Sequence, residues 1–116
     1  MINFKTIPQF DKDLKHLLKK YDSLNDDISI LKKVLEILPT ERPPFSFRIN
    51  NISSLKLIIK IKKIACKSLM GNGANSGLRL IYEYNVVEDI IVLIQIYHKS
   101  ENTTEDRDRI IKYCKQ

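Results

Sequence analysis

Two lysines, Lys60 and Lys62, stand two residues apart in an apolar segment of the chain. If this segment is a strand, its side chains alternate between the two faces of a sheet, so both lysines lie on one face about 7 Å apart. Arg79, which follows a glycine-rich loop, adds a third cation on the next predicted strand. The surrounding sequence holds no acidic residue to neutralise these cations, so we expect them on a face that stays open to solvent.

Cations arranged in this way are suited to the cleavage of RNA by its own 2′-hydroxyl. That reaction needs a base for the 2′-hydroxyl proton, a cation for the charge on the phosphoryl oxygens and an acid for the leaving 5′-oxygen. It requires no metal and no other cofactor, and we predict neither. Crowding with like charges is expected to lower the pKa of Lys60 and Lys62 toward that of a useful base, while Arg79 stays charged and clamps phosphate.

The last predicted strand brings further polar side chains to the same face. By alternation, Gln95, Tyr97 and Lys99 share one face, and His98 points to the other. Tyr97 is placed to stack on a base or to orient a phosphate. A surface that binds a polyanion without cutting it is an alternative that the spacing leaves open.

The distribution of charge favours a polyanionic partner. The formal net charge is +6, yet residues 42–82 contain eight basic residues and no acidic one, so the remainder of the chain is slightly acidic. Lysine used only for solubility is the alternative explanation.

With 116 residues, the chain is expected to form a single domain over residues 1–116. Cys66 and Cys114 lack metal-binding spacing, so no zinc site is predicted. We find no apolar run long enough for a signal peptide or a membrane span, and expect a cytoplasmic protein without a membrane partner.

Hydrophobic periodicity predicts a helical hairpin followed by strands. One helix is predicted from Pro8 to Tyr21, and a second starts at Ser23, with Asp26 in a capping box, and ends before Pro39. Strands are predicted over residues 45–49, 55–66, 78–84 and 89–99, with a glycine-rich loop at 70–77. A capping box at Thr103 is expected to open a last helix through Cys114.

The fold class predicted from this order is α+β. The helical hairpin packs on a twisted, mostly antiparallel sheet of about four strands, and a short helix ends the chain.

Several segments together resemble the RelE/ParE superfamily of toxins from type II toxin–antitoxin systems, in its RelE-like and HigB-like branch. The matching segments, in chain order, are Phe10 to Leu17, Lys60-Ile61-Lys62, Ser76 to Tyr82 and Ile96 to Glu101. No single segment is specific, but all of them occur in order and cover nearly the whole chain.

The resemblance implies a toxin that cuts messenger RNA in the ribosomal A site and is held inactive by a cognate antitoxin protein. Lys60 and Lys62 match the paired lysines that act as base and charge stabiliser, Arg79 matches the phosphate-binding arginine, and Lys99 falls near the family's acid. The C-terminal base-stacking tyrosine has no secure counterpart, since only Tyr113 is available. Tyr97 and His98 are alternatives for the acid.

The sequence thus assigns candidate residues to two roles. The predicted catalytic residues are Lys60, Lys62, Arg79 and Lys99, and the predicted substrate-binding residues are Lys63, Lys67, Gln95, Tyr97 and His98. Two other functions remain open: a ParE-like inhibitor of DNA gyrase without nuclease activity, and a non-cleaving RNA-binding module.

Overall fold

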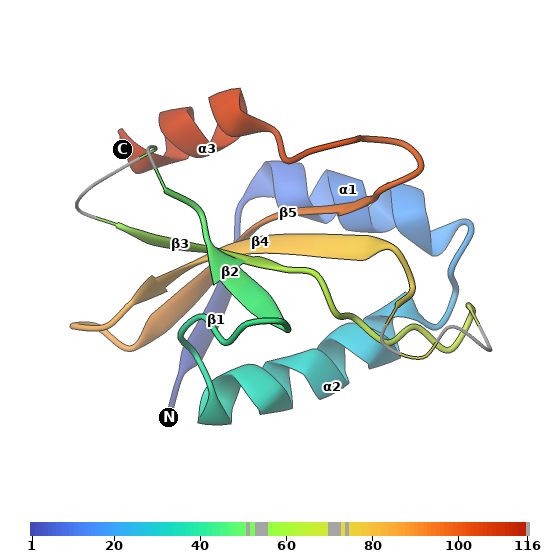
Figure 1. Ribbon diagram of the computed structural model, residues 1–116, viewed down its shortest axis with the longest axis horizontal. Coiled ribbons are helices and arrows are strands. Elements are labelled where there is room, and N and C mark those ends of the chain that lie inside the picture. Colours follow the sequence, from blue (N-terminus) through green and yellow to red (C-terminus); the bar gives the residue numbers. More distant parts are fainter. Residues whose placement is uncertain (51, 53–55, 70–72, 74, 116) are drawn as a thin grey trace.

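The computed structural model describes residues 1–50, 52, 56–69, 73 and 75–115. It has an α+β fold in which α2 and α3 lie on opposite sides of one sheet (Figure 1). No helix in these residues is long and apolar enough to span a membrane. The elements in chain order are β1 (Asn3–Thr6), α1 (Pro8–Leu18), α2 (Leu24–Ile37), β2 (Ser46–Arg48), β3 (Leu57–Ile61), β4 (Leu78–Asn85), β5 (Ile90–His98) and α3 (Arg107–Cys114).

The sheet has five strands in the order β1-β5-β4-β3-β2. Strand β1 is parallel to β5, and all other neighbours are antiparallel. The predicted α+β class is confirmed, but the expected sheet of about four strands lacked β1, which precedes the helical hairpin. The four residues of β1 carry little strand signal of their own. They pair with β5 from Asn3 opposite Ile90 to Thr6 opposite Leu93, a contact between distant parts of the chain that local patterns do not report.

Helices α1 and α2 form the predicted hairpin. Pro8 occupies the first turn of α1, where its missing N–H leaves no hydrogen bond unmade, but the helix ends at Leu18 rather than Tyr21. The predicted capping box at the start of α2 is wrong. The hydroxyl of Ser23 donates to the carboxylate of Asp27 at 2.7 Å and accepts from the backbone N–H of Ser68 at 2.9 Å, so it accepts from no N–H in the first turn of α2.

Each face of the sheet packs its own apolar layer. The hairpin covers one face, where buried residues such as Phe10, Leu17 and Leu35 meet Ile59 and Tyr82. The other face carries a smaller cluster under α3, formed by Ile58, Ile81, Ile94 and Ile110. The sheet is therefore covered on both sides, which the sequence analysis did not anticipate.

The strands differ from their predicted bounds mainly at β3. This strand ends at Ile61, whereas the prediction ran to Cys66, so Lys62 follows the strand and its backbone N–H donates to the carbonyl of Phe45 at 3.0 Å. The other predicted strands lie within a few residues of β2, β4 and β5. Half of the predicted glycine-rich loop, at residues 70–72 and 74, lies outside the described residues.

Helix α3 is the predicted C-terminal helix, but its cap is Asp106 rather than Thr103. The Asp106 side chain accepts from the backbone N–H of Arg109 at 3.0 Å. The side chain of Ile110 is fully buried against the sheet, which fixes the helix on that face.

Candidate functional site

The strand register places the predicted polar side chains on one face of the sheet. Lys60 pairs with Ile81, which in turn pairs with Gln95, and Arg79 pairs with Tyr97. Directly paired residues of neighbouring strands share a face. The shared face predicted from alternation is therefore confirmed for these four polar residues.

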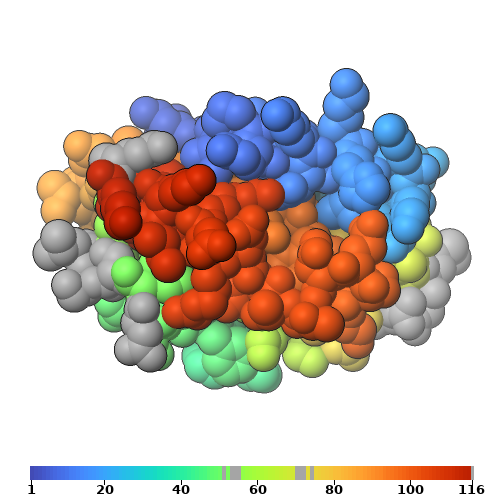
Figure 2. Space-filling model, turned by 90° about the horizontal axis from the view of Figure 1, so that it is seen from above, coloured from blue at the N-terminus to red at the C-terminus, as the bar shows by residue number. Residues whose placement is uncertain are grey.

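This face is not open, because α3 and the segment that leads to it lie across it (Figure 2). Glu101 in that segment pairs with His16 of α1 at 2.9 Å. The backbone N–H of Asp106 donates to Oε1 of Gln95 at 2.8 Å, and Gln95 is buried. The expected open row of cations is thus corrected: residues much later in the chain cover part of it.

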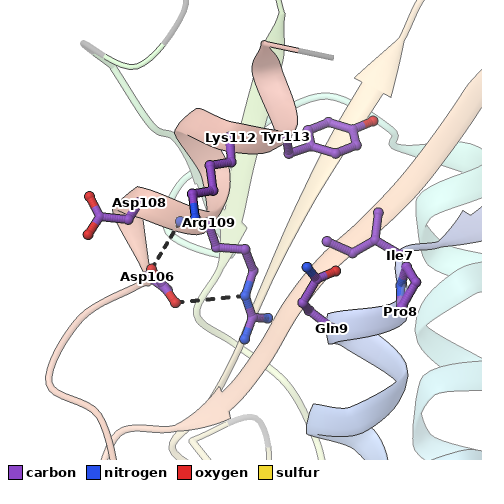
Figure 3. A pocket seen from close by; sticks show the side chains of 8 residues that line it. All are labelled: Ile7, Pro8, Gln9, Asp106, Asp108, Arg109, Lys112 and Tyr113. Carbon is purple, nitrogen blue, oxygen red and sulfur yellow. Dashed lines mark hydrogen bonds and ion pairs between the residues drawn. The ribbon is translucent and has the colours of Figure 1, made fainter.

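Helix α3 is anchored to α1 and to the sheet. The guanidinium of Arg109 contacts both carboxylate oxygens of Asp13, at 2.6 and 3.2 Å, and the carbonyl of Ile94 at 3.1 Å. Figure 3 shows Arg109 beside Asp106, the N-cap residue of α3, where α3 faces the first turn of α1 across a pocket.

The other end of α3 is fixed by Tyr113. Its hydroxyl donates to the carboxylate of Glu83, and the ammonium of Lys56 lies 4.8 Å from the centre of its ring. Burial, together with this hydrogen bond, raises the pKa of Tyr113. Tyr113 is therefore held in packing contacts rather than presented for stacking on a base.

Lys60 is shielded from solvent by Glu105. Its Nζ lies 2.8 Å from Oε1 of Glu105, and the two side chains are 15% and 11% exposed. Burial alone lowers the pKa of Lys60, but the hydrogen bond to Glu105 and the nearby Tyr97 outweigh it, so the pKa is raised above its ordinary value. The expected lowering of the pKa is therefore wrong for Lys60, because the pairing with Glu105 favours its charged form.

Tyr97 lies in the same covered region. Its side chain is buried, its ring centre is 5.9 Å from Nζ of Lys60, and its hydroxyl has no hydrogen-bond partner by geometry within the described part of the chain. Tyr97 and Gln95 were predicted to bind substrate from an exposed surface. The structure instead places both beneath the C-terminal segment.

Four of the other five predicted cations meet in an open pocket at the end of β3 and the start of β4. We call it the basic pocket, a cavity of about 240 Å³. It is lined by Pro44, Phe47, Lys62, Lys63, Asn75, Gly77, Arg79 and Lys99. Four of the nine predicted site residues are therefore brought together here, two of them from the segment that follows β3.

Backbone contacts hold the basic pocket in shape. The Arg79 guanidinium donates to the carbonyls of Lys62 and Leu78, both at 3.1 Å, which orients it toward the end of β3. The backbone N–H of Lys99 donates to the carbonyl of Gly77 at 2.9 Å. The φ of Gly77 is +89°, and a Cβ there would lie 2.7 Å from Nε2 of His98, so this close approach requires glycine.

The cations of the basic pocket have no carboxylate partner among the residues that the structure describes. None of the ion pairs found within the described residues includes Lys62, Lys63, Arg79 or Lys99. Nζ of Lys63 donates to the neutral amide oxygen of Asn75 at 2.8 Å, and Nζ of Lys62 lies 5.0 Å from the ring centre of Phe47. Cations beside an aromatic ring provide for both the phosphate and the base of a nucleotide.

His98 lies on the opposite face, as alternation predicted. Its ring stacks on Tyr21 with centroids 5.8 Å apart. The N–H of Ser100 donates to Nδ1 at 3.1 Å, so Nε2 carries the hydrogen and donates to the carbonyl of Ser76 at 2.9 Å. Both ring nitrogens are occupied away from the basic pocket. His98 is therefore not placed as an acid or as a substrate ligand there.

Lys67 is also separated from the basic pocket. Its backbone N–H contacts the carboxylate of Asp27, 3.3 Å from each oxygen, and it lines a different groove beside α2. The predicted role of Lys67 in the same site is thus not supported by its position.

Glu105 is the site residue that the sequence analysis missed. The Thr103-Thr-Glu-Asp sequence was interpreted only as a capping box, which concealed a carboxylate that meets Lys60 across the sheet. Burial raises the pKa of Glu105, but the hydrogen bonds from Lys60 and Thr104 outweigh it and the pKa is lowered. The charge pattern of the sequence could have indicated this pair. Residues 42–82 contain no acidic residue, so a carboxylate partner for a buried lysine in this segment must come from another part of the chain.

A metal-binding cluster is not found in the described part of the chain. No three side chains of histidine, cysteine, aspartate or glutamate lie close enough there to hold an ion.

Comparison with known proteins identifies similar structures but no family. No family model matches the sequence, and no curated protein is significantly similar to it. The solution structure of the conserved hypothetical protein HP0892 from Helicobacter pylori is similar with a TM-score of 0.54 and 28% identity, over 87% of this chain and 98% of that one.

A second solved structure is the crystal structure of a metal-bound toxin from Helicobacter pylori. It is similar with a TM-score of 0.51 and 25% identity, over 88% of this chain and 99% of that one. The similarity spans nearly the whole length of both proteins, so the fold of this chain is similar to that of the two bacterial proteins.

Proposed function

We propose that this chain is the toxin of a type II toxin–antitoxin pair and that it acts as an endoribonuclease on messenger RNA at the ribosome. The observation that carries the proposal is the basic pocket, where four cations that form no ion pair with any described residue surround a cavity beside Phe47. The fold similarity to a Helicobacter pylori toxin supports the toxin class. The RelE-like motifs support the nuclease activity within that class.

The basic pocket is suited to the scissile phosphate of RNA. Arg79, oriented by two backbone carbonyls, presents a planar guanidinium that can bind two phosphate oxygens. Lys63 adds a second fixed cation through its contact with Asn75. Such charges stabilise a phosphorane most when they are in place before the reaction, since no reorganisation is then needed.

In the proposed reaction, Lys62 first loses a proton to solvent, the Nζ of its neutral amine accepts the proton of the 2′-hydroxyl, and the 2′-oxygen attacks the adjacent phosphorus. The bond from phosphorus to the 5′-oxygen breaks, Lys99 protonates that oxygen, and a 2′,3′-cyclic phosphate remains. Arg79 stabilises the charge on the phosphoryl oxygens. The sequence analysis predicted that Lys60 and Lys62 together act as base and charge stabiliser. In the proposed reaction, Lys60 contributes only as a buried charge held by Glu105.

The test is cleavage of RNA by the purified chain, with programmed ribosomes and with free transcript, followed by mapping of 5′ ends. We expect Arg79→Ala to lower the rate by about 100-fold or more, as for loss of one preorganised charge stabiliser. Lys62→Ala and Lys99→Ala should each lower it by at least about tenfold. Lys15→Ala, an exposed lysine on α1, is the matched control and should cleave normally. Normal cleavage by Arg79→Ala would contradict the proposal.

A non-cleaving RNA-binding module is the second candidate, because the structure ties up two of the groups that chemistry would use. Lys60 is paired with Glu105, and both nitrogens of His98 are occupied. This candidate predicts salt-dependent RNA binding that Arg79→Ala weakens, without cleavage on or off the ribosome. Inhibition of DNA supercoiling that Lys62→Ala leaves unchanged would instead favour a gyrase inhibitor.

An antitoxin is the expected partner of such a toxin. It must keep RNA out of the basic pocket, either by covering the pocket or by binding elsewhere and restricting access to the ribosome.

A further inference from the structure

Helix α2 presents apolar side chains to solvent on the side that faces away from the sheet. Ile30, Val34 and Ile37 are 51%, 37% and 79% exposed. Their spacing of i, i+4 and i+7 places them on one face of the helix over two turns, about 10 Å in length. Leu31 and Leu35 of the same helix supply its buried face, so the exposed stripe is in addition to the side chains that pack the core.

The stripe borders an apolar groove between α2 and the segment after β3. The groove has a volume of about 310 Å³. Its walls are Ile30, Leu31 and Val34 on one side and Phe45, Ile64 and Ala65 on the other. Apolar side chains on a helix next to a groove of this kind form the usual receptor for an amphipathic helix with apolar residues at matching intervals.

Three charged side chains line the groove, two lysines and one aspartate. Lys63 and Lys67 line it, and Lys33 lies on the exposed face of α2 between Ile30 and Ile37. The described residues provide no carboxylate within ion-pair distance of these three lysines. Asp27 also lines the groove, but it is buried and its carboxylate accepts hydrogen bonds from Ser23 and the backbone of Lys67.

We propose that this groove, which we call the α2 groove, binds an acidic amphipathic helix of another protein. Apolar residues of that helix at i, i+4 and i+7 pack on Ile30, Val34 and Ile37, and its flanking acids meet Lys33, Lys63 and Lys67. A second copy of this chain is disfavoured as occupant, because two α2 grooves brought together would oppose lysine to lysine.

The location separates this partner site from the basic pocket. Lys63 lines both cavities, whereas Phe47, Arg79 and Lys99 line only the basic pocket. A helix in the α2 groove therefore reaches the edge of the basic pocket through Lys63 without needing to fill it. If the proposed function holds, the inhibiting antitoxin is the expected source of the helix, but binding itself requires no nuclease activity.

The experiment uses two designed helical peptides with leucine at i, i+4 and i+7, one with glutamate and one with lysine at the flanking positions. Binding to the full chain is measured by fluorescence anisotropy, and the contact surface by methyl NMR of labelled isoleucine and valine. We expect the acidic peptide to bind, with shifts at Ile30, Val34, Ile37 and Ile64, and the lysine peptide not to bind. Ile30→Asp should weaken binding by about tenfold or more, as for loss of a central apolar contact.

Val87→Asp is the matched control, since Val87 is 95% exposed in the turn between β4 and β5 and should leave binding unchanged. Lys67→Ala should weaken binding and reduce its dependence on salt. The proposal is overturned if the acidic peptide does not bind, if both peptides bind equally, or if the shifts fall only on the basic pocket. Self-association that Ile30→Asp abolishes in sedimentation would also overturn it, in favour of a second copy. No RNA is present, so these outcomes are independent of whether the chain cleaves.

Discussion

The ion pair between Lys60 and Glu105 joins the centre of the sheet to the segment before α3, and its removal should loosen that cover. Glu105→Gln keeps the size of the side chain and removes its charge. The ammonium of Lys60, only 15% exposed, would then remain charged without a carboxylate partner. Lys60→Met/Glu105→Gln removes both charges of this pair. The guanidinium of Arg107, which lies 3.7 Å from the Glu105 carboxylate, also loses this partner, but its side chain is 45% exposed and remains solvated.

The magnitude follows from the burial of the pair. Removing one partner of a fully buried pair costs about 3–5 kcal/mol. Since both side chains retain slight contact with water, we expect Glu105→Gln to lower the free energy of unfolding by about 2–3 kcal/mol. For a chain of this length, this corresponds to a loss of roughly 8–12 °C in Tm. The double variant should lose about 1 kcal/mol or less, because removing both charges also removes their desolvation cost.

The assay is urea denaturation followed by far-UV circular dichroism, with the m-value checked for each variant. His16→Ala is the control, since its pair with Glu101 has a similar N···O distance but side chains that are 59% and 30% exposed. Its effect should stay below that of Glu105→Gln by a wide margin. The reasoning is refuted if Glu105→Gln is no more destabilising than His16→Ala, or if the double variant is as unstable as the single one.

Three further predictions concern stability. Folding lowers the pKa of Glu105, so the contribution of Glu105 to the free energy of unfolding is complete above the ordinary glutamate pKa and is lost as pH falls through the lower folded value. Denaturation midpoints measured from about pH 7 to about pH 3 should show this loss, and those of Glu105→Gln should not. Gly77→Ala should lower the free energy of unfolding by about 2 kcal/mol or more, because the new Cβ clashes with the ring of His98. Gly73→Ala, whose Cβ would meet nothing within 4 Å, should lower it by about 1 kcal/mol. Equal losses of the two variants in thermal denaturation would refute the role of the clash. Arg109→Lys keeps the charge opposite Asp13 but loses the two-pronged contact, and should lower the free energy of unfolding by about 1–2 kcal/mol; protection of α3 amides from hydrogen exchange should fall more than that of α2, and equal changes would contradict the anchoring role.

Local patterns in the sequence were sufficient where local physics decides the structure. The spacing of Phe10, Leu14 and Leu17 on α1 is a helical repeat, and Pro39 ends α2 at a predictable point, because both depend on residues within one or two turns. Alternation also predicted which side chains share a face, since the period of a strand does not depend on its partner. That Lys60, Arg79 and Tyr97 of three different strands share one face also required the assumption that the polar sets of neighbouring strands lie on the same side, and the register confirms it.

The same patterns failed where distant residues decide. β1 exists because β5 offers it a parallel edge, and four residues with weak alternation cannot report such a partner. Glu105 reaches Lys60 only because α3 folds back over the sheet. The direction of the Lys60 pKa shift expected from its sequence neighbours was therefore wrong.

The sequence by itself determined the α+β class, the helical hairpin and the cationic segment, because composition and periodicity are properties of contiguous residues. Only the tertiary structure decided which cations are available. It covered Lys60 with Glu105, directed His98 and Lys67 elsewhere, and left Lys62, Lys63, Arg79 and Lys99 around one pocket. Whether a ligand can reach a cation depends on what packs above its side chain. For Lys60 the covering residue is Glu105, which lies 45 positions later in the chain.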